Sequence, residues 1–398
     1  MEEIKRIQLS EIADLITKGT TPTTLGYEFK DEGVNFLKIE CFDENGAFLE
    51  SKVTHISEEC HKKLKRSQLK AGDVLFSIAG AIGRVAIVTE EMIPANTNQA
   101  LAIIRISDEQ VYLPYIKLIL TSPIVIEQFE RKKQGVAQLN LSLKDINEIS
   151  IPLPNKDKQI ELAELFDKVA DIIVKRNMEL TSLDNLIQAR FVEMFGDPVQ
   201  NTKGWNIDTC KNLTSKIGSG ATPKGGRESY GTEGISLIRS MNVYNNRFEY
   251  KDLAYITDEQ ADKLSNVTIE ENDVLLNITG ASVARCCAVP KELIPARVNQ
   301  HVAIVRCKDR LLPEFLCSMF TEDSYQRLLW SIATSGGATR EAITKQQIED
   351  LVLIVPPIEL QQQFVDFCKQ VNKLKVEIQK SLDETQILFD SLMQKYFG

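Results

Sequence analysis

IPANTNQALAIIR, residues 93–105, returns as IPARVNQHVAIVR, residues 294–306, with no gap in the alignment. Further matches keep the same order along the chain, among them Gly-x-Thr-Pro at 19–22 and 220–223. The period is about 200 residues, half of the 398-residue chain. Solenoid repeats are far shorter, roughly 20–50 residues, so each copy is expected to be a domain with an extension. The sequence therefore predicts a tandem duplication.

Within each copy, short apolar runs bounded by Gly and Pro predict strands that are followed by helices. Ser142 with Asp145, and Thr344 with Gln347, form capping-box pairs that predict a short helix near the end of each copy. Strands are expected at 74–78, 85–88 and 101–104, and longer helical segments at 113–133 and 313–332.

Each copy ends in a long amphipathic segment. Apolar residues recur there at three- and four-residue steps, which predicts helices over roughly 157–195 and 359–396. Neither helix can bury its apolar stripe alone, so we expect the two to pack on each other. The predicted fold class is α+β, with two tandemly duplicated mixed α/β domains joined by two long coiled-coil helices. The expected boundaries are 1–155 and 198–357 for the domains, and 156–197 and 358–398 for the helices.

The composition is that of a globular protein, with 43% hydrophobic and 26% charged residues. No apolar stretch approaches the roughly 18 residues of a membrane span, and the N-terminus has no apolar signal core. We therefore expect a cytoplasmic protein with no membrane partner. The eight cysteines lack the spacing of a disulfide framework, no CxxC pair is present and there are only three histidines, so no metal site is predicted.

Catalytic motifs are missing from the sequence. There is no Gly-x-x-x-x-Gly-Lys-Ser/Thr phosphate loop, no Asn/Asp-Pro-Pro-aromatic motif of an adenine methyltransferase and no Pro-Cys motif of a cytosine methyltransferase. Gly218-Ser219-Gly220 is too short to indicate a nucleotide site. Three scattered histidines give no basis for a nucleophile–base pair. We expect no catalytic residues, no cofactor and no enzymatic activity in this chain.

The combination of these features resembles the specificity (S) subunit of type I restriction-modification systems. The resemblance rests on two divergent units that each end in a long helix, on Gly220-Ala221-Thr222-Pro223, on the Asn98-Gln99 and Asn299-Gln300 pairs, and on the closing Phe-Gly. It covers essentially the whole chain. The first unit departs from the family pattern at Lys18-Gly19-Thr20-Thr21-Pro22, and Ala284 replaces the glycine found at Gly83.

The resemblance implies a division of labour. Each globular unit would be a target recognition domain that reads one half of a bipartite site in double-stranded DNA. The long helices would pack antiparallel and set the gap between half-sites, giving the molecule approximate two-fold symmetry of the kind that inverted half-sites require. Two methyltransferase (M) subunits and two restriction (R) subunits would be the protein partners. Because the loops at 23–28 and 225–230 differ, we expect an asymmetric target.

A net charge of −9 predicts weak DNA binding by this chain alone, since phosphate contacts require Lys and Arg. Base edges and phosphates are contacted mainly by Arg, Lys, Asn and Gln. On that chemistry the candidate DNA-binding residues are Arg84, Asn96, Lys132, Lys133, Gln138 and Asn140 in the first unit, and Lys224, Arg227, Arg239, Asn242, Arg247, Arg297 and Arg340 in the second. Any one of them could instead be a solvated surface side chain.

The Asn98-Gln99 and Asn299-Gln300 pairs recur although the two units should read different bases. We therefore predict that these pairs cap or turn the chain. Two other functions stay open on the sequence: a coiled-coil adaptor that binds no DNA, and a specificity subunit of a related restriction system that cuts on both sides of its target.

Overall fold

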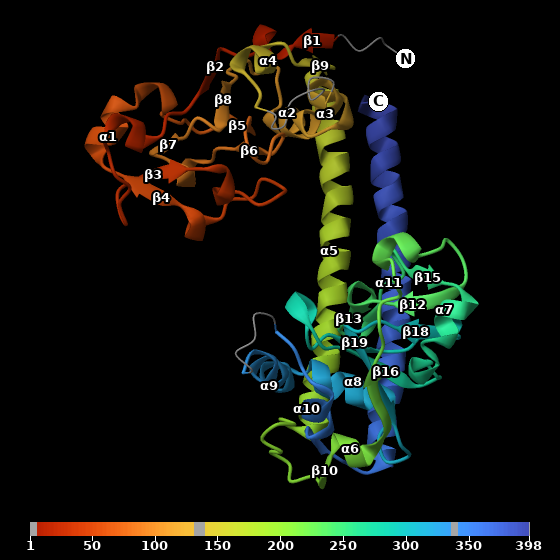
Figure 1. Ribbon diagram of the computed structural model, residues 1–398. Helices are drawn as coiled ribbons and strands as arrows, with labels where there is room; N and C mark the ends of the chain where they lie inside the picture. The colour runs from red at the N-terminus through yellow and green to blue at the C-terminus, as the bar shows by residue number, and fades with distance from the viewer. Residues whose placement is uncertain (1–5, 131–139, 336–340, 398) are drawn as a thin grey trace. The chain divides into compact units, whose positions relative to one another are not determined.

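The duplicated stretches form the same strands in both copies of the computed structural model (Figure 1). Residues 93–105 contain β7 (Ala95–Thr97) and β8 (Leu101–Arg105), and residues 294–306 contain β18 (Ala296–Val298) and most of β19 (Val302–Cys307). The structure describes residues 6–130, 140–335 and 341–397.

The first copy is built around a four-stranded antiparallel sheet of order β2-β8-β5-β6, beside a three-stranded sheet of order β4-β3-β7 in which β3 is parallel to β7. A further pair joins β1 to β9. The elements are β1 (Arg6–Gln8), β2 (Leu15–Lys18), β3 (Val34–Leu37), β4 (Thr54–Ile56), α1 (Glu58–Lys63), β5 (Val74–Ser77), β6 (Val85–Ile87), α2 (Leu113–Leu120), α3 (Pro123–Glu130), α4 (Leu143–Asn147) and β9 (Ser150–Pro152).

The second copy repeats this topology, with sheets of order β11-β19-β16-β17 and β15-β12-β18, the pair β10-β20 and an added hairpin β13-β14. The elements are β10 (Ile207–Thr209), α6 (Cys210–Leu213), β11 (Thr214–Ser219), β12 (Ile235–Ile238), β13 (Val243–Tyr244), β14 (Arg247–Phe248), β15 (Ala254–Ile256), α7 (Asp258–Asp262), β16 (Asp273–Asn277), β17 (Cys286–Ala288), α8 (Pro313–Thr321), α9 (Asp323–Thr334), α10 (Lys345–Glu349) and β20 (Val352–Ile354).

The central strands are buried on both faces, so their sequences are continuously apolar. Successive side chains of a strand point to opposite faces. In β8, Ala102 and Ile104 join the core cluster that also holds α2, whereas Leu101 and Ile103 join a second cluster that also contains Leu37 of β3 and Ala95 of β7. The strands predicted at 74–78, 85–88 and 101–104 are confirmed.

Two helices of 40 residues each follow the two copies: α5 (Lys156–Phe195) and α11 (Ile358–Phe397). The predicted bounds agree within one or two residues. The compact units of the chain divide both helices between them: unit 1 is Met1–Asn177 with Lys380–Gly398, and unit 2 is Met178–Gln379.

The helices run antiparallel within each unit. In unit 1, Phe166 near the start of α5 packs against Phe389 and Phe397 near the end of α11, with ring centroids 5.4 and 5.5 Å apart. In unit 2, Phe191 near the end of α5 packs against Phe364 near the start of α11, at 5.5 Å. The closing Phe of the first copy, Phe195, lies in the core of unit 2, and that of the second copy, Phe397, lies in the core of unit 1.

The predicted apolar stripe is buried only near the helix ends. In α5, Leu162 and Val169 are buried, whereas Ile172 is 45% exposed. In α11, Val371 is buried but Leu374 and Leu388 are each 50% exposed. The predicted packing of the two helices on each other is confirmed near their ends, whereas part of the stripe between the ends stays exposed.

The helical segment predicted after each sheet is two helices, not one. Thr121 and Ser122 separate α2 from α3, because Pro123 cannot donate the backbone hydrogen bond that would continue α2. In the second copy, Glu322 ends α8 and caps α9, its side chain accepting from the backbone N–H groups of Ser324 and Tyr325. The capping boxes at Ser142 and Thr344 are confirmed.

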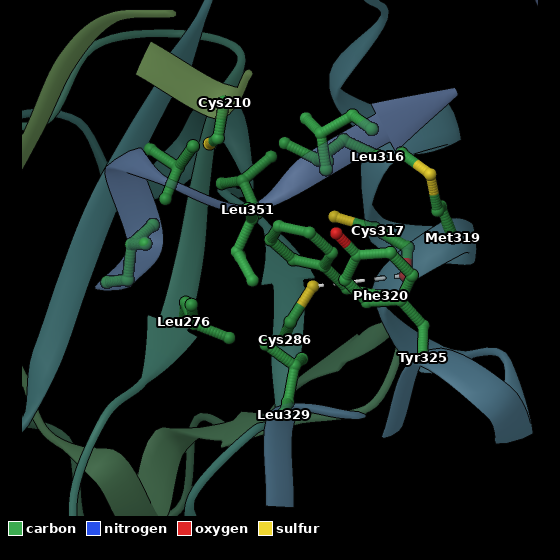
Figure 2. Close-up of a cluster of buried hydrophobic side chains, with 14 of the residues drawn as sticks. Cys210, Leu276, Cys286, Leu316, Cys317, Met319, Phe320, Tyr325, Leu329 and Leu351 are labelled. Atoms are coloured by element: carbon green, nitrogen blue, oxygen red, sulfur yellow. Dashed lines mark hydrogen bonds between the residues drawn. The ribbon is translucent and has the colours of Figure 1, made fainter. Parts of the chain in front are cut away.

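The core of unit 2 is rich in thiols (Figure 2). Cys210, Cys286 and Cys317 lie among Leu276, Phe320 and Tyr325, and the thiol of Cys286 donates to the carbonyl of Cys317 with a sulfur–oxygen distance of 3.9 Å. All eight cysteines are free. Burial raises the pKa of the Cys210 thiol to about 12, so it stays protonated near neutral pH.

A buried ion pair recurs in the two sheets. Arg105 binds Asp73 through Nε and Nη2 at 2.6 and 2.7 Å, and Arg306 binds Asp273 in the same way at 2.7 and 2.9 Å. Both carboxylates are almost completely buried. Hydrogen bonding to the carboxylate raises the pKa of each arginine.

Candidate nucleic-acid interface

Three loops meet at the same end of the four-stranded sheet in each unit, and we call each set a loop cluster. In unit 1 they are the Gly-x-Thr-Pro loop after β2 (19–22), the loop between β5 and β6 (78–84), and the turn between β7 and β8 (98–100). In unit 2 the loops are 220–223, 278–285 and 299–301.

The loop clusters are held together by hydrogen bonds that match between units. The Ile78 N–H donates to the Ala100 carbonyl at 2.8 Å, and the Ile278 N–H donates to the His301 carbonyl at 3.0 Å. Gly19 and Gly220 lie so close to the next strand that a Cβ there would be 1.9 Å from the Thr97 carbonyl oxygen and 1.8 Å from that of Val298. Glycine is therefore required at both positions because any side chain would collide with backbone.

In each Asn-Gln pair the asparagine bonds to the backbone and the glutamine bonds to a threonine side chain. The side chains of Asn98 and Asn299 accept from the backbone N–H two residues on, at 3.1 and 3.0 Å, which turns the chain between the strands. The predicted turning role is confirmed for the asparagines. The glutamines are exposed, and the hydroxyls of Thr21 and Thr222 donate to the side-chain oxygens of Gln99 and Gln300.

Three predicted DNA-binding residues are instead structural. Asn96 is fully buried and donates to the Leu64 carbonyl and the Ser67 hydroxyl, both at 3.0 Å. Asn242 is fully buried and donates to the Glu249 carbonyl at 2.9 Å. Arg297 is 9% exposed, and its guanidinium donates to the carbonyls of Ala261 and Ala296. The prediction is wrong at these positions because their polar groups are already bound inside the fold.

Two more of the predicted DNA-binding residues are partly buried and donate hydrogen bonds to backbone carbonyls of the protein. Arg84 donates from Nη1 to the Phe42 carbonyl at 3.1 Å. Arg239 donates to the Asp252 carbonyl, and its guanidinium carbon lies 5.4 Å from the centre of the Tyr230 ring. Their charges still contribute to the local potential, but their hydrogen-bonding geometry is set by the protein.

Asn140, Lys224 and Arg247 are exposed, as a contact with DNA requires. Arg247 lies over the ring of Tyr244 at 5.0 Å, and Arg285 lies 4.6 Å from the same ring. The tyrosine thus holds two cations at the β13–β14 hairpin. Lys132, Lys133, Gln138, Arg340 and the side chain of Arg227 lie outside the described residues.

A groove of about 670 Å³ runs along β11, the edge strand of the unit 2 sheet, and three lysines line it. Lys211 and Lys345 each lie 3.6 Å from a carboxylate oxygen of Glu349. Lys216 has no ion-pair partner in the described part of the chain. Sequence reasoning missed these lysines because they are not adjacent in the sequence.

The described residues contain no group of three or more His, Cys, Asp or Glu side chains that could hold a metal ion. Nor does any helix within 6–130, 140–335 and 341–397 have the length and hydropathy to cross a bilayer.

The family model for the type I restriction modification DNA specificity domain matches the chain twice, at residues 1–182 and 203–386. The chain belongs to this family. The two matches correspond to the two copies of the repeat, so each copy is a specificity domain in its own right.

The chain is also similar in sequence or in structure to individual proteins of type I systems. The specificity subunit of the Escherichia coli type I restriction enzyme EcoBI is 30% identical over 217 residues, a match that spans 51% of this chain and 45% of that relative. The S subunit of a type I system from M. genitalium has a TM-score of 0.56 at 12% identity, covering 100% of this chain and 97% of the other. A chain from a study of type I complex assembly and conformational transition has a TM-score of 0.62 at 18% identity, covering 98% and 96%. These two structures share the fold of this chain.

Proposed function

We propose that this chain selects DNA by sequence, each specificity domain reading one half of an asymmetric, two-part target. The double match to the DNA specificity domain carries the proposal. Its support is that the loop clusters share one framework but present different side chains, and unlike surfaces select unlike bases. Exposed Lys224 and Arg247, with the lysines along β11, supply positive charge for phosphate contacts.

In this proposal residues 1–155 and 198–357 recognise DNA, and 156–197 with 358–398 set the distance between half-sites. Each helix of 40 residues is about 60 Å long at 1.5 Å per residue, which spans between one and two turns of duplex at roughly 34 Å per turn. A spacer of fixed length would make recognition depend on the gap between half-sites as well as on their bases.

The chain is further proposed to act in the cytoplasm as the non-catalytic subunit of an assembly with two methyltransferase and two restriction subunits. Apolar side chains that stay exposed along the middle of the helices support a protein partner there, among them Met178 at 64%, Val376 at 69% and Ile387 at 68%. The net charge of −9 supports a partner that supplies further phosphate contacts.

The test is a comparison of methylated adenines in host DNA with and without this chain, combined with co-purification of its methyltransferase. We expect a split motif whose methylation disappears on deletion and returns when the chain is re-expressed. An unchanged methylation pattern, together with no bound methyltransferase, would contradict the proposal and favour an adaptor that binds no DNA.

A further inference from the structure

The two loop clusters have the same framework but differ at two neighbouring positions. Where unit 1 has Ala79 and Ala100, unit 2 has Thr279 and His301. The glutamine beside them is present in both units, as Gln99 and as Gln300. Different side chains at matching positions of a shared framework are what two domains that read different sequences require.

In unit 2 these side chains form a hydrogen-bonded chain. The Thr222 hydroxyl donates to Oε1 of Gln300, which leaves the amide nitrogen of Gln300 facing Nε2 of His301 at 3.2 Å. An amide nitrogen can only donate, so Nε2 accepts and the proton of the neutral imidazole is on Nδ1. Nδ1 then donates to the Thr279 hydroxyl at 2.6 Å.

These hydrogen bonds hold the side-chain amide of Gln300 at both its oxygen and its nitrogen. Gln300 is exposed and His301 is half-buried, so Gln300 stays accessible to a ligand while His301 holds it. Among the described residues, Thr222 and His301 leave one amide hydrogen of Gln300 and one lone pair of its Oε1 without a partner. A donor beside an acceptor is the pattern that complements N7 and N6 of adenine in the major groove. In unit 1, Gln99 is bound by Thr21 at its oxygen, and alanines replace the brace.

We propose that Gln300 is a specificity-determining residue of unit 2 that reads an adenine, and that His301 and Thr279 are positioning residues that hold its amide in register. Gln99 is the corresponding reader in unit 1, with lower stringency because Ala79 and Ala100 stand where Thr279 and His301 brace Gln300. The inference rests on the proposed function.

The test uses the full chain in complex with the methyltransferase subunit that co-purifies with it, and double-stranded DNA with both half-sites randomised. Wild type should enrich a two-part sequence with an adenine at one position of the half read by unit 2. Q300A should lower the preference for that adenine by roughly tenfold to a hundredfold and leave the other half unchanged. H301A, and T279A/H301A which restores the unit 1 side chains, should weaken the preference at that position only.

Q300R is the second variant, because arginine pairs with N7 and O6 of guanine and should move the preference at that position from adenine to guanine. Q99A is the matched control and should change one position of the opposite half. If wild type enriches a two-part sequence and Q300A and Q300R enrich the same one, the inference is overturned while the proposed function stands. If wild type enriches no sequence, the proposed function fails and this inference fails with it.

Discussion

At the residue scale, one arginine in each four-stranded sheet neutralises a buried aspartate. Asp273 is completely buried, and Arg306 binds both of its carboxylate oxygens. Removing one partner of such a pair leaves an uncompensated charge inside the protein, which costs far more than the pair contributes to stability.

Arg306→Ala should therefore lower the free energy of unfolding of unit 2 by about 3–5 kcal/mol. Hydrogen exchange of β16 and β19 amides would measure the loss. Arg310→Ala is the control, because Arg310 is 61% exposed and its pair with Asp208 should be worth less than about 1 kcal/mol. Equal losses in the two variants would contradict this account.

The buried thiols make stability depend on alkaline pH. Burial raises the pKa of Cys210 from 9.0 to about 12. Above pH 9 the unfolded chain loses this proton while the folded chain keeps it, so stability that is fully present below pH 9 is lost as the pH rises towards 12.

Cys210→Ala should make the decline in unfolding free energy between pH 9 and 11 less steep than in wild type. Denaturant unfolding of the two proteins at a series of pH values would test this. Parallel declines would show that Cys210 does not titrate differently in the two states.

At the scale of elements, one glutamine anchors the start of each long helix. Gln361 of α11 is fully buried, accepts from the Leu312 N–H at 3.0 Å and donates to the carbonyls of Arg310 and Pro356 at 3.1 and 2.9 Å. Gln159 of α5 makes the same three kinds of contact in unit 1. The side chain thus joins the helix to the segment that leads into α8 or α2.

Gln361→Ala should destabilise unit 2 by about 2–4 kcal/mol, because it leaves the Leu312 N–H and two carbonyls without partners and opens a cavity. Thermal unfolding would measure the loss of stability, and hydrogen exchange of amides at the start of α8 would show where it occurs. Gln363→Ala, two residues away on the exposed face, should change stability by less than about 0.5 kcal/mol. A comparable effect of both variants would contradict the anchoring role.

At the scale of the whole molecule, unit 1 needs residues from both ends of the chain, because it combines Met1–Asn177 with Lys380–Gly398. Phe397 is 2% exposed and lies in the core of unit 1 with Tyr115 and Phe166, at ring distances of 6.1 and 5.5 Å. The C-terminal residues thereby complete a core that begins near the N-terminus.

Phe397→Ala should destabilise unit 1 by about 3–5 kcal/mol and leave unit 2 nearly unchanged. Amide exchange in β5 and β8 compared with β16 and β19 would separate the two units. Leu388→Ala is the control, since Leu388 is 50% exposed on the same helix. Loss of protection in unit 2 alone would contradict this assignment of Phe397.

The sequence by itself determined the duplication, the strands at 74–78, 85–88 and 101–104, the capping boxes and the two long helices. Each of these is a local pattern: an ordered set of matches, a continuous apolar run, a residue spacing. The family resemblance followed from the same patterns, and the double family match confirms it.

Only the tertiary structure decided which polar residues are available for DNA. Asn96, Asn242 and Arg297 have the chemistry of base readers, but their partners inside the fold are brought to them by other strands and helices. The Thr–Gln bonds of the loop clusters join residues 78 positions apart in both units, and no local pattern could have predicted them. The helix stripe shows the same limit, because periodicity predicts an apolar face whereas burial depends on what packs against it.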